Sequence, residues 1–250
     1  MEKIRISIVS FINSMPFKYG LETSDYIIEN SIISNDIPSE CARKLIHDEA
    51  DIGLVPVAAI PEIPSAEIIS DYCLSSNGNV ETVLLLSDVP VDRIERIYLD
   101  YHSRTSVKLV KILCRYYWRI NPEFIPASEN YEKNIQKTVA GLVIGDRAFK
   151  IGKQFGYQID LSNEWIKFKN MPFVFAAWVS NKKIPKKYLI EFNKSIKKGT
   201  SEIDNVINSY SSKIISDAHL KSYLTESIRY ELDDKKREAI NVFLELAAKV

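Results

Sequence analysis

The chain alternates short apolar runs with longer segments in which apolar residues recur every three or four positions, a pattern typical of an α/β protein. Apolar runs at residues 4–9, 26–33 and 51–55 predict strands. Helical patterns at residues 16–21 and 38–48 lie between them. The first 55 residues therefore predict a βαβ unit.

The rest of the chain continues the same alternation. Strands are predicted at 68–74 and 80–86, on either side of a turn at 76–79. The pattern restarts after residue 90 with a strand at 96–99 and a long helix at 105–118. The remaining predicted elements are strands at 123–125, 142–144 and 173–179, helices from residue 185 onward, and a final helix at 233–248.

This order favours two α/β lobes, with the second inserted into the first. We expect residues 1–87 and 175–250 to form lobe one and residues 88–174 to form lobe two, with crossovers near 86–90 and 172–176. The architecture that fits is a two-lobed, hinged binding fold with its ligand cleft between the lobes.

Charge and composition exclude one class of binding partner. Hydrophobic residues make up 46% of the 250 residues, and 33 basic residues balance 33 acidic ones. A nucleic-acid-binding protein usually carries a basic face, so we expect no nucleic-acid partner. The lysine surplus at residues 182–198 is expected to be a solvated surface.

The sequence shows no signal peptide, no membrane-spanning segment and no metal-binding motif. The N-terminus lacks an apolar signal-peptide core, and no run of about 18 apolar residues predicts a membrane span. Cys41, Cys73 and Cys114 are expected to be reduced core thiols, and the three histidines show no metal-ligand spacing. We therefore expect a cytoplasmic protein with no membrane partner, either a monomer or a weak homodimer.

Three polar segments lie at or beyond predicted strands: residues 10–16, 51–56 and 102–106. In open α/β sheets, small ligands bind at the carboxyl ends of the strands. Free backbone N–H groups and helix N-termini favour an anion there. The sequence therefore predicts a cleft for a small anionic molecule.

Six segments taken together carry a resemblance to a known family: residues 10–13, 51–57, 78–85, 103–106, 144–146 and 172–175. In this order they resemble the chorismate dehydratases of the futalosine-dependent menaquinone pathway, over residues 4–180. The resemblance implies the type 2 periplasmic-binding-protein architecture. It also implies conversion of chorismate to 3-[(1-carboxyvinyl)oxy]benzoate and water, with no cofactor.

The chain departs from the family pattern at three positions. Met15 stands where the family commonly has Arg, Thr82 where it often has Ser, and His102 where it has a small or polar residue. Thr in place of Ser keeps the hydroxyl, whereas Met in place of Arg removes a charge.

Chorismate is a dianion, so the first requirement is a carboxylate site. Ser103, Arg104, Thr105 and Ser106 are the best candidates, because hydroxyls and amides at a helix start can bind an anion. The alternative is an ordinary N-cap. Arg104 either binds a carboxylate through two hydrogen bonds or points outward to the lobe surface.

Asn13 is the strongest single candidate for a catalytic residue. It follows an apolar strand and precedes Pro16, which places it on a turn at the predicted cleft. Its amide can donate to the departing hydroxyl or to a carboxylate. The alternative is a turn Asn that bonds its own backbone.

The other substrate-binding candidates rest more heavily on the resemblance. Thr82 contacts the ligand or is a structural strand residue, and Asp146 either faces the cleft as an acceptor or caps a helix. Pro56 is expected to shape the cleft wall. Phe173 and Phe175 either stack on the substrate ring or belong to the core.

The sequence shows no obvious general base. His102 adjoins the anion segment, and imidazole titrates near neutral pH, but the family does not require His there. We therefore hypothesise that the substrate's own enolpyruvyl carboxylate removes the ring proton, with His102 as the alternative.

Two other functions fit the same fold. One is a non-catalytic binding protein or sensor of small anions. The other is the sister enzyme of the same pathway, 1,4-dihydroxy-6-naphthoate synthase. That enzyme is expected to open with an acidic, threonine-rich loop, which the Asn13 segment does not match.

Overall fold

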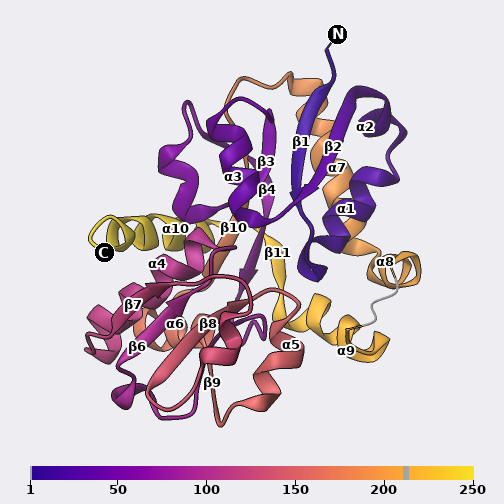
Figure 1. Cartoon of the computed structure of the whole chain (residues 1–250). Coiled ribbons are helices and arrows are strands. Elements are labelled where there is room, and N and C mark those ends of the chain that lie inside the picture. The colour runs from indigo at the N-terminus through magenta and orange to yellow at the C-terminus, as the bar shows by residue number, and fades with distance from the viewer. Residues whose placement is uncertain (1, 211–213) are drawn as a thin grey trace. The chain divides into compact units, whose positions relative to one another are not determined.

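The fold, seen in a computed structural model, is mixed α/β and is described over residues 2–210 and 214–250 (Figure 1). Its contacts divide the chain into two compact units. The first unit comprises Met1–Ser75 and Val174–Asp234, and the second comprises Ser76–Phe173 and Lys235–Val250. Each unit is built on its own β-sheet.

The first unit contains a six-stranded sheet in the order β11-β4-β10-β3-β1-β2. β1 pairs in parallel with both β2 and β3, which confirms the predicted parallel core, while β10 runs antiparallel to β3. The strands are β1 (Ile4–Val9), β2 (Ser31–Asp36), β3 (Ile52–Pro56), β4 (Glu67–Ser76), β10 (Phe173–Ser180) and β11 (Arg229–Glu231).

Two glycines bring helices of the first unit together. A Cβ added at Gly20 of α1 would lie 2.0 Å from the Ser195 carbonyl oxygen, and one added at Gly199 of α7 would lie 1.8 Å from the Pro16 carbonyl oxygen. Neither position therefore has room for a side chain. The α-helices of this unit are α1 (Met15–Glu22), α2 (Asp25–Asn30), α3 (Pro38–Ile46), α7 (Lys186–Ser201), α8 (Ile203–Ser209) and α9 (Asp217–Ser222).

One predicted strand is wrong. Residues 26–33 divide into the end of helix α2 and the start of strand β2. Ser24 caps α2 by accepting a hydrogen bond from the Ile27 N–H, and the Asn30 side chain bonds the Tyr26 carbonyl. A short apolar run fits a helix and a strand about equally well, and here the cap decides between them.

The second unit contains a five-stranded sheet in the order β7-β6-β8-β5-β9. β6 pairs in parallel with β7 and β8, whereas β5 runs antiparallel to β8 and β9. The elements are β5 (Val83–Ser87), β6 (Arg96–Leu99), α4 (Arg104–Ile112) with a π-helical extension (Leu113–Trp118), β7 (Glu123–Pro126), β8 (Val139–Ile144), α5 (Ala148–Ile151), β9 (Tyr157–Asp160), α6 (Leu161–Lys169) and α10 (Asp234–Ala247).

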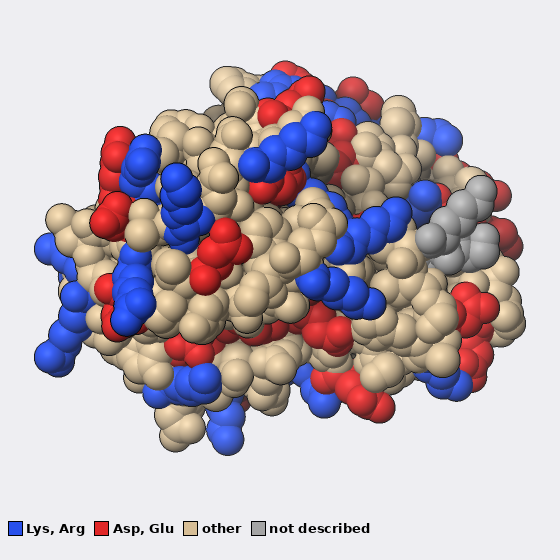
Figure 2. Space-filling view, turned by 60° about the horizontal axis from the view of Figure 1, so that its bottom comes forward, with Lys and Arg blue, Asp and Glu red and all other residues tan. Residues whose placement is uncertain are grey.

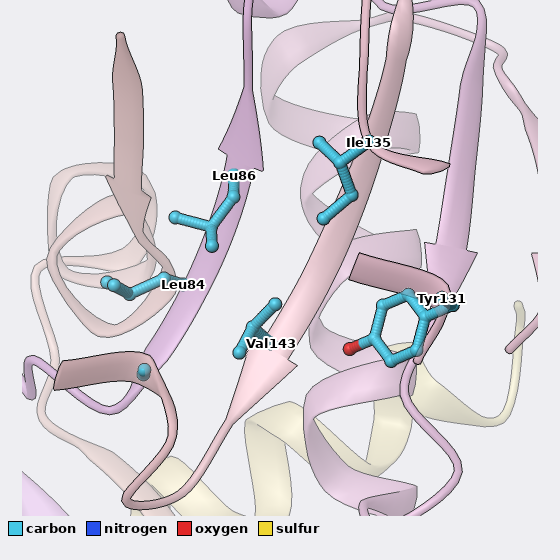
Figure 3. Packing of buried hydrophobic residues seen from close by; sticks show 6 residues of the cluster. Leu84, Leu86, Tyr131, Ile135 and Val143 are labelled. Carbon is cyan, nitrogen blue, oxygen red and sulfur yellow. The ribbon is translucent and has the colours of Figure 1, made fainter. Parts of the chain in front are cut away.

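A core cluster of the second unit lies against the central strands of this sheet. Figure 3 shows Leu84 and Leu86 of β5 and Val143 of β8 beside Ile135 and Tyr131. All five are at least nine-tenths buried. This packing holds β5 and β8 in the register that positions the site residues described below.

The C-terminal helix α10 packs with the second unit, whereas the sequence pattern placed it in lobe one. Phe243 of α10 lies against Trp165 of α6 and Phe173, with ring centroids 6.1 and 5.2 Å away. Lys108 of α4 donates to the Ala247 carbonyl. The unit boundaries follow residues 75 and 173 instead of the expected 87 and 174, because β5 joins the second sheet.

Basic and acidic residues are interspersed on the face shown in Figure 2, in keeping with the zero net charge. Within residues 2–210 and 214–250, no helix combines the length and apolar character that a bilayer crossing needs. Cys41, Cys73 and Cys114 are buried thiols, as expected.

Candidate functional site

Most of the predicted substrate-binding residues lie along one edge of the second unit's sheet. β6 and β8 are parallel neighbours, so the segments after them begin at the same edge. β5 runs the other way, with Val83 opposite Ile144, and therefore starts there. The Gly145 N–H donates to the Thr82 carbonyl at 2.9 Å. Thr82, the 103–106 segment and Asp146 thus share the carboxyl-end edge where α/β proteins bind ligands.

The 103–106 segment forms the start of helix α4. Ser103 is the N-cap, and its side-chain oxygen accepts from the Ser106 N–H at 3.0 Å. Its hydroxyl also donates to the Ser106 hydroxyl at 2.9 Å. The capping alternative is therefore correct for Ser103. The Ser106 hydroxyl belongs to the same capping network, and the anion-binding interpretation of Thr105 and Ser106 stays a prediction based on their place in the first turn of α4.

Asp100 organises this edge, and sequence reasoning missed it. Its side chain is buried, directly after β6. One carboxylate oxygen accepts from the His102 N–H at 3.0 Å and from His102 Nδ1 at 2.8 Å. The other accepts from the Ile144 N–H at 3.1 Å and lies 3.2 Å from the Tyr131 hydroxyl. It is also ion-paired with Arg147.

The guanidinium of Arg147 compensates the buried charge of Asp100. Arg147 lies between two carboxylates, because its other terminal nitrogen donates to Glu132 at 2.6 Å. Burial alone would raise the pKa of Asp100, but the hydrogen bonds from His102 and the charge of Arg147 outweigh it and hold that pKa below its usual value. Asp100 is therefore an anion in the folded protein.

The ionised Asp100 also orients His102. A carboxylate can only accept, so the imidazole Nδ1 carries the proton of this hydrogen bond. In the neutral ring, Nε2 is then left as an acceptor. The imidazole also lies against the Tyr101 ring, with centroids 4.0 Å apart and the two planes tilted by 33°. The geometry gives His102 the fixed tautomer that a general base needs.

A second buried carboxylate, Asp160, holds the segment that precedes Thr82. One of its oxygens accepts from the backbone N–H groups of Val80 and Glu81, both at 2.8 Å. The other caps α6 by accepting from the Ser162 and Asn163 N–H groups. Asp160 is thus a positioning residue for Thr82.

Asp146 follows Gly145, whose φ of 72° lies in the left-handed region that glycine adopts without strain. The Asp146 carbonyl accepts from the Phe149 N–H at 3.3 Å at the start of α5, so both alternatives for the Asp146 side chain, facing the cleft and capping the helix, stay predictions. Asp146 is half-buried. Its carboxylate remains a candidate acceptor at the edge.

Asn13 lies at the carboxyl-end edge of the first unit's sheet, in a 3-10 turn (Ile12–Ser14) between β1 and α1. Ser14 fixes this turn by donating to the Phe11 carbonyl at 2.8 Å, and the Tyr230 hydroxyl donates to the Asn13 carbonyl at 3.2 Å. The side-chain oxygen of Asn13 is buried without a hydrogen-bond partner among the described residues. Because buried polar atoms are nearly always bonded, such an atom needs an explanation.

Pro56 ends β3, next to β1, and so lies at the same edge of the first unit as Asn13. Phe173 does not qualify as a substrate-binding residue. Its ring packs edge-on against both Trp165 and Phe243, with centroids 5.3 and 5.2 Å away. The prediction that it stacks on a substrate ring is therefore wrong, and the core alternative is correct. Phe175 is only partly buried.

Sequence reasoning placed the edges correctly but missed three residues that organise them. Asp100 and Arg147 each follow a strand with at most two residues between, the same signal that identified the 103–106 segment. Asp160 ends a strand that the hydrophobic pattern did not predict. In the described part of the chain, no group of three His, Cys, Asp or Glu side chains is placed to share a metal ion.

Solved structures share this fold. A protein from Archaeoglobus fulgidus superposes with a TM-score of 0.78 at 13% identity, covering 99% of this chain and 97% of that one. A Candida albicans protein described as having the generic periplasmic binding protein fold gives 0.68 at 14% identity, over 100% and 91% of the two chains. The periplasmic aliphatic sulphonate binding protein of Escherichia coli gives 0.59 at 12% identity, over 98% and 92%. The chain therefore has the periplasmic-binding-protein fold.

Sequence comparisons go further than the fold. A chorismate dehydratase of Thermus thermophilus is 24% identical over 241 residues, which cover 87% of this chain and 87% of that protein. The family model described as menaquinone biosynthesis matches residues 4–249. This match spans nearly the whole chain, and the protein belongs to the menaquinone-biosynthesis family.

Proposed function

We propose that the protein is a cytoplasmic carbon–oxygen lyase that converts chorismate to 3-[(1-carboxyvinyl)oxy]benzoate and water. Membership of the menaquinone-biosynthesis family and the chorismate dehydratase relative support this reaction. The reaction removes the ring hydroxyl and the neighbouring ring proton as water. Since the ring becomes aromatic, the protein has only to hold the dianion in a reactive geometry.

The observation that carries the proposal is the unpartnered side-chain oxygen of Asn13. A buried amide oxygen without a partner costs about 1–3 kcal/mol, which a substrate hydroxyl would recover by donating to it. The amide nitrogen of the same side chain can donate to the departing oxygen. Asn13 is thus suited to hold the leaving hydroxyl.

The edge of the second unit provides the groups for the carboxylates. We assign Thr82, Arg104, Thr105 and Ser106 to substrate binding, with the first turn of α4 supplying backbone N–H groups. Ser103 supports them as the cap, Asp146 accepts from the substrate, and Pro56 shapes the wall. Holding chorismate in this way also keeps the enolpyruvyl arm from folding over the ring, which would lead to Claisen rearrangement. Such positioning is worth up to about 7–11 kcal/mol in well-oriented systems.

The substrate's own enolpyruvyl carboxylate is proposed as the base that removes the ring proton. His102 is the alternative, and its 2.8 Å contact with Asp100 is the observation in its favour. The two possibilities differ in one consequence. A protein base makes turnover depend on the protonation of His102, whereas a substrate base does not.

The direct test is incubation of the purified protein with chorismate and detection of the aromatic product by ultraviolet absorbance after chromatography. Asn13→Ala is expected to lower kcat about 100-fold, since one positioned hydrogen-bonding group is worth about that much. Asn205→Ala, on the exposed face of α8, is the matched control and should leave kcat unchanged. Chorismate binding without turnover would favour a sensor, and neither binding nor turnover would overturn the proposal.

The base is identified by His102→Ala and by the pH dependence of turnover. Near-normal turnover with an unchanged pH profile supports the substrate carboxylate. A collapse of turnover in His102→Ala makes His102 the base. A chorismate-bound structure adds the geometric test, because the proposal requires both Asn13 and the 103–106 segment to contact one substrate molecule.

A further inference from the structure

The first unit contains a cavity of about 320 Å³ that lies away from Asn13. It is lined by residues around the start of β1, by Asp51 just before β3, and by the start of α7. Asn13 and Pro56 lie at the opposite, carboxyl ends of β1 and β3. The cavity is therefore separate from the candidate active-site edge. Its volume is at the small end of the range for small-molecule sites, about 300–1,000 Å³.

Two tyrosines form the apolar wall of this cavity. Tyr26 of α2 and Tyr188 of α7 have ring centroids 6.1 Å apart, and Ile4 and Ile184 extend the apolar lining. The Tyr188 hydroxyl is bonded to the Ser31 hydroxyl at 2.5 Å, which fixes that ring. Aromatic walls of this kind suit a planar ring, since offset and edge-to-face contacts between rings are favourable.

The lining carries more positive than negative charge. Its main acid, Asp51, is already compensated by Arg5 at 2.6 Å and Lys182 at 2.7 Å. Lys3 and Lys183 also line the cavity and form no ion pair among the described residues. Lys187 lies over the Tyr26 ring, 5.4 Å from its centroid. Three ammonium groups therefore remain available to a negatively charged ligand, and Glu2 is the other acid of the lining.

We propose that this cavity is a second binding site, for a small aromatic carboxylate. The ring would pack against Tyr26 and Tyr188, and the carboxylate would be held by Lys3, Lys183 and Lys187. This assigns a function to part of the lysine surplus at 182–198 that the sequence pattern attributed to a solvated surface. A ligand here would contact the loop before α7 as well as α2, two segments far apart in the chain.

The test measures binding of 4-fluorobenzoate to the 250-residue chain by fluorine NMR and isothermal titration calorimetry. We expect saturable binding of 4-fluorobenzoate. Benzoate should displace it at concentrations at least tenfold lower than acetate or inorganic phosphate. The double variant Lys183→Gln/Lys187→Gln should weaken 4-fluorobenzoate about tenfold, the change expected when roughly 1.4 kcal/mol is lost.

Two controls separate this site from the active-site edge and from general charge effects. Lys194→Gln, on α7 but outside the cavity, should bind 4-fluorobenzoate as the wild type does. Asn13→Ala should also bind it normally, whatever its effect on chorismate turnover. Absence of saturable binding, equal competition by phosphate, or loss of binding in Asn13→Ala but not in the double lysine variant would each overturn the inference.

Discussion

The two units each bury one aspartate beside an arginine, but at opposite kinds of sheet edge. Asp51 precedes β3 at the amino end of the first unit's sheet and is paired with Arg5 and Lys182. Asp100 follows β6 at the carboxyl end of the second unit's sheet and is paired with Arg147. The pairing chemistry is the same, so what separates a structural from a candidate functional carboxylate is its place on the sheet.

The neighbours of the two carboxylates make the same distinction. Asp51 is surrounded by cations and the backbone, which leaves no side chain to be oriented for chemistry. Asp100 additionally holds an imidazole and lies beside a tyrosine hydroxyl. The first network therefore stabilises its unit, and the second also arranges groups that can handle a proton.

The largest effect is expected for Asp100→Asn. The substitution leaves Arg147 paired with Glu132 alone, and breaking a buried ion pair by removing one partner costs about 3–5 kcal/mol. Hydrogen exchange followed by mass spectrometry should show faster exchange in peptides from β6 and β8 and unchanged exchange in β1 and β3. Turnover of chorismate should also fall. Equally faster exchange in both units would show that the Asp100 network does not stabilise the second unit specifically.

Asp51→Asn should destabilise the first unit less, by about 1.5–3 kcal/mol, because charge-assisted hydrogen bonds to partly exposed partners are lost. Exchange should accelerate in β1 and β3. Chorismate turnover at a temperature where the variant remains folded should stay at the wild-type level. A loss of turnover with intact folding would contradict the structural role of this network.

The stability contributed by Asp51 is expected to depend on pH. Burial raises the pKa of Asp51, but hydrogen bonds from Arg5 and Lys182 outweigh it and lower the pKa to about 2. Because this is below the unfolded value of about 3.9, the stabilisation is complete above that value and is lost as the pH falls toward 2. The difference in unfolding free energy between wild type and Asp51→Asn should therefore shrink over this range. A constant difference would show that the lowered pKa does not contribute.

The smallest effect is expected for Asp48→Asn. Its carboxylate also contacts Arg5 and Lys182, at 3.3 and 3.0 Å, but the side chain is 69% exposed. Exposed ion pairs contribute little, because water and salt screen them. Thermal unfolding of this variant should match that of the wild type. A clearly lower melting temperature would mean that Asp48 and Asp51 stabilise the protein jointly through Arg5 and Lys182.

Much of the sheet architecture could be predicted because the apolar runs are long and separated by clear turns. The parallel β1–β3 core and the restart after residue 90 follow directly from that pattern. The prediction for residues 26–33 failed because α2 and β2 have only six residues each, too few for periodicity to separate helix from strand. The sequence also could not predict which unit α10 joins, because an amphipathic pattern does not identify the surface against which a helix packs.

The sequence predicts where the candidate site lies more readily than which side chains bond to one another there. Strand ends identified Asn13 and the 103–106 segment. The Asp100–Arg147 pair depends on β6 and β8 being neighbours in parallel register, which is a long-range fact. Phe173 was misassigned because an apolar strand residue looks the same whether it faces a ligand or, as here, Phe243.

The assignment of α10 to the second unit has a practical outcome for dissecting the protein into fragments. The polypeptide passes between the units three times, after residues 75, 173 and 234. A fragment spanning only 76–173 would leave the Trp165 and Phe173 rings without Phe243 and expose them to water. Isolating that unit therefore calls for a circularly permuted or fused gene in which the last sixteen residues are tethered back to it.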